Sequence, residues 1–204
     1  DGPAAVHFID EGQPRAFRRG IYRSRSTAGL PTDEDLFVSI TRGMPGSAMP
    51  PHGALSAEDR WHLVDHLKSL AWIDVPGAGF NPFDREDRTP VKIPEPLPAT
   101  RERIDAGRAY VEAMDCRTCH GPDYRGLERS HREFDWTDEV GRPIPRSGDL
   151  TRGVFKSGDT PGDLYRSIFL GRGGSPMTVY GPLFHTEERR WSIIHFVMSL
   201  KRVP

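Results

Sequence analysis

One sequence pattern occurs twice in this chain, about 130 residues apart. Residues 32–70 and residues 160–200 each contain a Thr-x-x-Asp start, an apolar segment, a loop of Gly, Pro and Met, and a final segment from Trp to Ser-Leu. An offset that changes by only two residues along both copies indicates duplication, so the sequence predicts two homologous domains. The matched pairs are Leu36 with Leu164 and Met49 with Met177 at 128, and Trp61 with Trp191 and Leu70 with Leu200 at 130.

Each copy carries the signals of two helices with a loop between them. Thr32 and Thr160 each precede an Asp by three residues, and a Pro follows Thr160 directly. A hydroxyl cap, acids in the first turn and Pro at the first helical position are all typical of a helix start. The second helix of each copy is predicted to follow Ser56 or Thr186. Its apolar residues recur at three-residue spacing: Trp61, Val64 and Leu67 in one copy, Trp191, Ile194 and Val197 in the other.

The predicted fold is all-α, with two tandem domains and long loops. Residues 1–72 form the first domain and residues 101–204 the second. Residues 73–100 hold six prolines, which disfavour helix and favour extended chain, so this segment is predicted to be a linker. Residues 102–115 read as a further amphipathic helix. Its apolar side carries Ile104, Gly107, Tyr110, Val111 and Met114.

Both cysteines of the chain lie in the motif Cys116-Arg117-Thr118-Cys119-His120, directly after that helix. Two thiols three positions apart can each add across a vinyl group of haem, and the adjacent His then ligates the iron. Two other interpretations of the cysteine pair are open. A thioredoxin-like redox site prefers a βαβ setting, and a zinc site requires four ligands.

The surrounding residues resemble a class I (mitochondrial-type) cytochrome c domain of the bacterial kind over residues 102–202. In that family a helix precedes the attachment motif, a loop methionine is the sixth ligand of the iron, and a closing helix packs across the first. The resemblance implies His120 and Met177 as axial ligands; the alternative for Met177 is a gap-filling methionine. It rests on His120-Gly121-Pro122-Asp123, Gly126, Gly148-Asp149-Leu150-Thr151, and Met177, which lies 57 residues after His120. No ligand role is expected for His131, His185 or His195.

The first copy contains no cysteine. The family commonly reads His-Gly-x-x-Gly-x-Gly-Asp-Gly-Pro-Ala after its attachment motif, and this chain starts Asp1-Gly2-Pro3. We therefore expect a longer precursor with a first attachment motif upstream; the alternative is a natively haemless domain. If a haem is bound there, Met49 is the expected sixth ligand by analogy with Met177. Weaker choices are Met44, His52, His62 and His66.

Composition narrows the function classes. The 28 basic and 29 acidic residues leave a formal net charge of −1, so no basic excess points to nucleic acid. No apolar run approaches a membrane span. The hydrophobic fraction of 36%, with 21 Gly and 19 Pro, suits two small modules packed on a prosthetic group.

The resemblance implies electron transfer through haem c, one on this chain and a second if the upstream segment exists. The chain is expected to be a dihaem relay subunit with redox partner proteins, and to contain no catalytic residue. The alternative is the haem subunit of an enzyme, such as a dihaem peroxidase or a thiosulfate- or nitrite-converting enzyme, with an open haem site. A third interpretation is a haemless interaction module. Because thioether attachment of haem takes place outside the bacterial cytoplasm, the expected location is the periplasm or the outer face of the cytoplasmic membrane.

Overall fold

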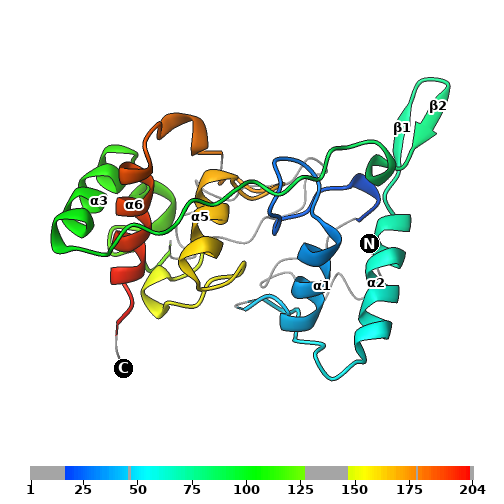
Figure 1. The fold of residues 1–204 in the computed structure, drawn as a ribbon, viewed down its shortest axis with the longest axis horizontal. Helices are drawn as coiled ribbons and strands as arrows, with labels where there is room; N and C mark the ends of the chain where they lie inside the picture. The colour runs from blue at the N-terminus through cyan, green and yellow to red at the C-terminus, as the bar shows by residue number, and fades with distance from the viewer. Residues whose placement is uncertain (1–16, 46, 127–146, 178, 203–204) are drawn as a thin grey trace.

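The computed structural model describes residues 17–45, 47–126, 147–177 and 179–202, and these are mostly helical (Figure 1). The expected all-α class holds, with one short β-hairpin as the exception. In chain order the elements are η2 (Phe17–Arg19), α1 (Asp33–Arg42), α2 (Ala57–Ser69), β1 (Ile73–Val75), β2 (Ala78–Phe80), η3 (Pro82–Asp84), α3 (Arg101–Ala113), α4 (Arg117–His120), η5 (Leu150–Arg152), α5 (Pro161–Phe169), η6 (Gly181–Leu183) and α6 (Glu187–Ser199), where η denotes a 3-10 helix.

The predicted helix starts are confirmed. Thr32 Oγ1 accepts from the backbone N–H of Asp35 at 3.0 Å, and the Asp35 carboxylate accepts from the backbone N–H of Thr32 at 3.0 Å. The same reciprocal capping box joins Thr160 and Asp163 at the start of α5. Each box satisfies two backbone donors that a helix end would otherwise leave free. Ser56 and Thr186 cap α2 and α6 as expected.

The two methionine loops have the same backbone hydrogen bonds. The backbone N–H of Met44 donates to the carbonyl of Met49 at 3.0 Å, and that of Arg172 donates to the carbonyl of Met177 at 3.1 Å. In each loop a serine side chain also donates to the carbonyl of the first of these residues, at 2.7 Å and 2.8 Å. The two loops therefore hold their methionines in the same local frame.

A further correspondence lies outside the two segments that the sequence pattern paired. Residues 17–24 and residues 150–157 each form a 3-10 turn and then a glycine with positive φ, 65° at Gly20 and 61° at Gly153. Both then continue as an aliphatic residue, an aromatic residue, a cation and a serine, at a constant offset of 133. The sequence pattern alone could have revealed this stretch, but the different offset concealed it.

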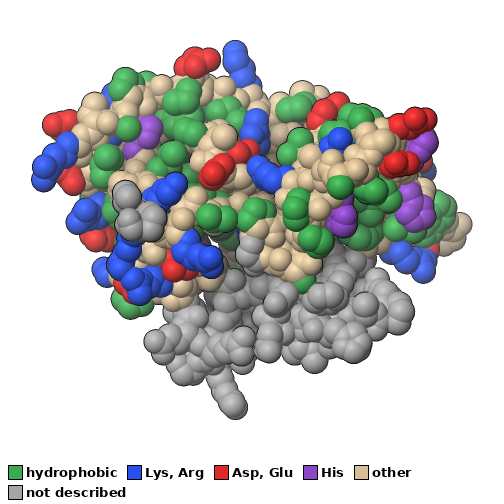
Figure 2. Space-filling view, turned by 90° about the horizontal axis from the view of Figure 1, so that it is seen from below, with side chains coloured by type: hydrophobic (Ala, Val, Ile, Leu, Met, Phe, Trp, Pro, Cys, Tyr) green, Lys and Arg blue, Asp and Glu red, His purple; other side chains and the backbone are tan. Residues whose placement is uncertain are grey.

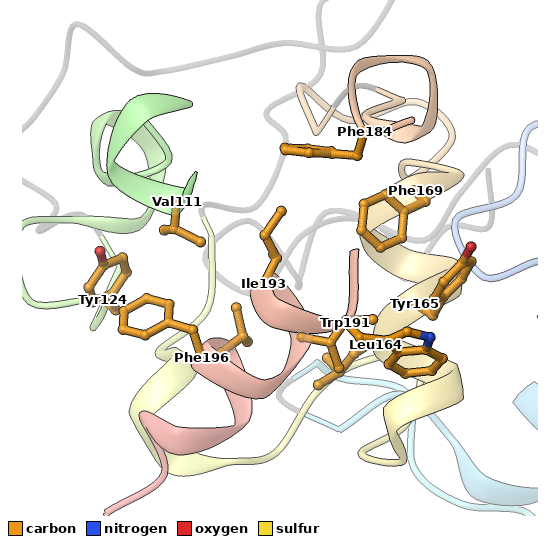
Figure 3. Close-up of a cluster of buried hydrophobic side chains, with 11 residues drawn as sticks. Val111, Tyr124, Leu164, Tyr165, Phe169, Phe184, Trp191, Ile193 and Phe196 are labelled. Carbon is orange, nitrogen blue, oxygen red and sulfur yellow. The ribbon is translucent and has the colours of Figure 1, made fainter. Parts of the chain in front are cut away.

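The buried side chains form two clusters. The first cluster is Tyr22, Leu30, Leu36, Ile40, Val64, Ala71 and Phe83. The second cluster, drawn in Figure 3, is Val111, Tyr124, Leu164, Tyr165, Phe169, Phe184, Trp191, Ile193, Ile194, Phe196 and Val197.

The proline-rich segment is less uniform than the sequence predicted. β1 and β2 pair antiparallel, with Ile73 opposite Phe80, and Pro76-Gly77 makes the turn between them. Phe83 then belongs to the first cluster. From there the chain crosses to the elements of the second cluster (Figure 1), where the carbonyl of Leu97 lies 2.7 Å from the His195 ring. Nine-tenths of the His195 side chain is shielded, as expected for a packed histidine.

The tightest contact between helices joins α3 to α6. An added Cβ on Gly107 would lie 1.9 Å from the backbone oxygen of Ser192 and 2.9 Å from the Cβ of Phe196. The two backbones therefore approach more closely than any side chain at position 107 allows. Arg103 and Glu188 add an ion pair across the same crossing at 2.8 Å.

We predict that Gly107→Ala destabilises the fold by about 1–3 kcal/mol, because the added methyl forces the two helices apart. This loss outweighs the gain of up to about 1 kcal/mol that Ala brings to a helix. Gly162→Ala in α5 is the matched control, since its Cβ would meet only ordinary contacts at 3.6 Å or more. Chemical unfolding followed by circular dichroism measures both. Equal midpoints for the two variants would show that the crossing has room at Gly107.

Asp33 links three elements of the first cluster. Its carboxylate accepts from Lys68 of α2 at 2.7 Å and from Arg88 after η3. Burial opposes its ionisation, but the hydrogen bonds from Arg88 and Lys68 prevail and lower the pKa of Asp33 below its ordinary value of 3.8. A carboxyl with a lower pKa in the folded state stabilises the fold above its unfolded pKa, and this contribution is lost as the pH falls through the folded pKa.

Asp33→Asn is therefore expected to lower the free energy of unfolding at pH 7 by up to about 1 kcal/mol. The deficit should shrink as the pH falls below about 4, where the wild-type carboxyl also becomes neutral. Asp65→Asn is the control, because Asp65 is more exposed and pairs with Lys68 alone at 3.1 Å. Urea unfolding at a series of pH values measures the difference. A deficit that stays constant down to pH 3 would contradict the assigned ion pairs.

Candidate haem-attachment site

The attachment motif forms a separate helical turn directly after α3. Asp115 takes a left-handed backbone (φ 52°), which ends α3 and starts the short helix α4 with Cys116 at its N-cap. Asp is among the few residues that adopt this conformation readily. The backbone N–H groups of Cys119 and His120 donate to the carbonyl of Cys116 at 3.3 Å and 2.9 Å. Both thiols and the imidazole thus belong to one turn.

Both cysteines are free thiols and half-buried, and Cys116 packs against the second cluster. Burial raises the pKa of Cys116, and the charges of Cys119 and Asp115 raise it further. Burial and Asp115 also raise the pKa of Cys119. Dithiol redox sites have the opposite property, a cysteine whose pKa is lowered toward neutral pH. The electrostatics of the pair therefore do not favour the thioredoxin-like interpretation.

His120 has the protonation state that ligation of iron requires. Burial lowers the pKa of its imidazole, so the ring is neutral at pH 7. Its Nδ1 atom is buried and has no hydrogen-bond partner within the described part of the chain. A neutral imidazole with an unsatisfied ring nitrogen is a common metal ligand. The residues present therefore fit a c-type haem, with two thiols for its vinyl groups and one imidazole for its iron.

A tight loop after His120 returns the chain to α6. The backbone N–H of Gly126 donates to the carbonyl of His120 at 2.9 Å. Gly121 has φ 78°, and an added Cβ there would lie 2.5 Å from the carbonyl oxygen of Gly126. Tyr124, which also has positive φ, is buried and meets Phe196 of α6 edge to face at 5.6 Å (Figure 3). This aromatic contact fixes the attachment turn from its C-terminal side.

Sequence reasoning had not assigned Asp115 or Tyr124 to the site. An Asp directly before the first cysteine was a usable signal, because its short polar side chain tolerates a left-handed backbone. Tyr124 offered no such signal, since a positive φ is uncommon for a bulky residue.

The two methionines occupy loops of the same geometry but differ in exposure. Met177 lies between α5 and η6 and is half-buried. Met49 lies between α1 and α2 and is 37% exposed. Their roles as iron ligands stay predictions. Of the other residues considered, Met44 and His52 are half-buried, His62, His66 and His185 are exposed as expected for surface residues, and His131 lies outside the described residues.

Two wider searches of the structure give negative findings. Among residues 17–126 and 147–202 as described, no group of three or more His, Cys, Asp or Glu side chains is arranged to hold a metal ion. In the same part of the chain, no helix combines the length and apolar character needed to cross a bilayer.

Comparison with known proteins identifies one informative relative. No protein-family model and no curated protein matches the sequence. Among solved structures, the chain is similar to a chain of the Kuenenia stuttgartiensis reducing HAO-like protein complex Kustc0457/Kustc0458, with a TM-score of 0.85 and 34% sequence identity. The match covers 99% of this chain and 87% of that chain. This chain therefore belongs to the same protein family as that component of the reducing HAO-like complex.

Proposed function

We propose that this chain is an electron-transfer subunit of a redox protein complex and carries a c-type haem on Cys116 and Cys119. His120 and Met177 are its proposed axial ligands. The observation that carries the proposal is the attachment turn itself. Two free thiols and a neutral, largely buried imidazole share one helical turn, held against α6 on both sides.

Each residue has a defined task in holding the cofactor. The S–H of each cysteine adds across a vinyl C=C of the haem, which forms a thioether and needs no oxidant. The bound haem supplies a one-electron couple at its iron. The imidazole of His120 and the thioether of Met177 fill the axial positions, and a filled coordination sphere favours electron transfer over substrate chemistry. The second cluster keeps water away from the attachment turn.

The relative supports a role within a complex. It is a component of an assembly of two named proteins described as reducing and HAO-like. By analogy, we propose that this chain passes electrons to or from a redox partner protein. Because haem attachment of this kind takes place outside the bacterial cytoplasm, the proposed location is the periplasm or the outer face of the cytoplasmic membrane.

We further propose that the chain is a tandem of two cytochrome c-like domains, residues 1–72 and 101–204, joined by residues 73–100. The shared caps, methionine loops and 3-10 turns support duplication. In such a tandem, a haem in the first domain would use Met49 as its sixth ligand. The two haems would form a relay.

The burial of the two paired tryptophans supports a second haem domain. Trp191 on α6 is fully buried, whereas Trp61 at the same position of α2 is 39% exposed. α6 is covered by α3, and no described helix covers α2 in the same way. Figure 2 shows the consequence, since hydrophobic and histidine side chains are visible together over the half that carries α1 and α2. A haem and its attachment helix would cover such a face.

The axial ligation can be tested with carbon monoxide. We expect the reduced wild-type protein not to bind CO, because both axial positions are filled. Met177→Ala should open one position and give a CO-bound spectrum, whereas Met198→Ala in α6 should not. In the full-length protein, Met49→Ala should open a second site.

The contradicting results are specific. Ready CO binding by the wild type would favour the enzyme interpretation, with an open haem site. A Met177→Ala protein that still excludes CO would show that another residue ligates the iron. The absence of CO binding in Met49→Ala alone would remove the second haem as proposed and leave the first.

A further inference from the structure

Five cations gather where the elements of the two clusters meet. We call them the junction cations: Arg23, Arg25 and Arg42 from the first half of the chain, and Lys156 and Arg172 from the second. Two serines mark the centre of the contact, with the Oγ atoms of Ser24 and Ser157 3.1 Å apart. Arg25 donates to the carbonyl of Leu170 at 2.8 Å, which ties the first half to the end of α5 (Figure 1).

The contacts at this junction are reciprocal. Ser24 and Ser157 are equivalent residues at the offset of 133 found above. Arg25 contacts Leu170, and the residues equivalent to these two, Gly158 and Arg42, also lie together. An added Cβ on Gly158 would fall 2.6 Å from Nη1 of Arg42. Reciprocal contacts between equivalent residues are the property of a two-fold interface, so both halves contribute equally to the junction.

The junction cations are partly withdrawn from water. Burial lowers the pKa of Arg25. Burial also lowers the pKa of Lys156, and the neighbouring charges of Arg172 and Arg23 lower it further. The Nε atoms of Arg25 and Arg42 are buried without an acceptor among the described residues. The cluster therefore holds positive charge and unused donors in one place.

The nearest carboxylates are engaged elsewhere. Asp35 accepts from the backbone N–H of Ser26 at 2.7 Å and from the cap of α1. Asp163 lies beside Gly158 but serves the cap of α5 and pairs with Arg166 at 3.3 Å. Within the described residues, Arg25, Arg42 and Lys156 form no ion pair with a carboxylate.

Such a cluster needs an anion. Burying a charge without a partner is costly, and neighbouring like charges add to the cost. Arg side chains bind the planar, paired oxygens of carboxylates and phosphates especially well. We propose that the junction cations form an oxyanion-binding site built from both halves of the chain.

Two sources can supply this oxyanion chemistry. One is the pair of carboxylates that each haem carries, and this source rests on the proposed function. The other is a free oxyanion such as inorganic phosphate. The two sources differ in what they leave behind, because haem carboxylates are held on the protein and a free anion exchanges with buffer.

The haem source has a redox consequence. A positive charge near the haem favours the ferrous state, which carries one positive charge fewer than the ferric state. Removing a junction cation therefore lowers the midpoint potential of the nearby haem. Arg101→Gln is the matched control, since it removes the same charge from a side chain that is 92% exposed on α3.

The experiment compares Lys156→Met and Arg25→Gln with this control in the haem-loaded protein. Redox titration measures the midpoint potential. Thermal unfolding is measured in phosphate and in sodium chloride of equal ionic strength, and circular dichroism verifies that each variant is folded. If haem carboxylates fill the site, both variants lower the potential at least twice as much as Arg101→Gln, and phosphate stabilises no more than chloride.

If a free oxyanion fills the site, phosphate raises the unfolding temperature of the wild type above that in chloride, and both variants lose this gain. The proposal is overturned if the potentials shift no more than in the control and phosphate has no specific effect. Purified protein without covalent haem would contradict the proposed function, while the phosphate measurement would still decide whether the oxyanion site exists.

Discussion

The close backbone contact between α3 and α6 at Gly107 is the constraint on which the candidate site depends. It fixes the direction in which α3 ends, and the attachment turn follows within three residues of that end. Tyr124 then packs on Phe196, so the turn is held against α6 from both sides. The thiols and the imidazole owe their common placement to these two contacts, because four helical residues alone would not hold it.

The same local features have different surroundings in the two halves. The caps and methionine loops match, because both depend on hydrogen bonds within a few residues. Burial does not match, since Trp191 is enclosed by α3 and Trp61 has no such cover in the described structure. The reciprocal contacts around Ser24 and Ser157 then join the halves through cations and serines. This junction has more charge than an ordinary packed interface, which sets it apart from the two hydrophobic clusters.

Local signals in the sequence predicted the helices and their starts well. A capping Thr, an Asp three residues later and an apolar period are sufficient to begin a helix at Asp33 or Pro161. The β-hairpin at Ile73–Phe80 was not predicted, because the prolines around it dominate the pattern. The junction was also missed, since its contacts join residues more than 130 positions apart. The ligand roles of Met177 and Met49 depend on where the iron lies, which sequence spacing indicates only by analogy.

Covalent haem at Cys116 and Cys119 is the central claim, and peptide mapping by mass spectrometry tests it most directly. The protein is purified from its native source, digested without reduction, and the peptide that contains Cys116–His120 is identified. The account predicts this peptide with one haem joined through two thioethers, at the mass of peptide plus haem with no loss of hydrogen. A peptide with two unmodified thiols, or with a disulfide between them, would contradict it.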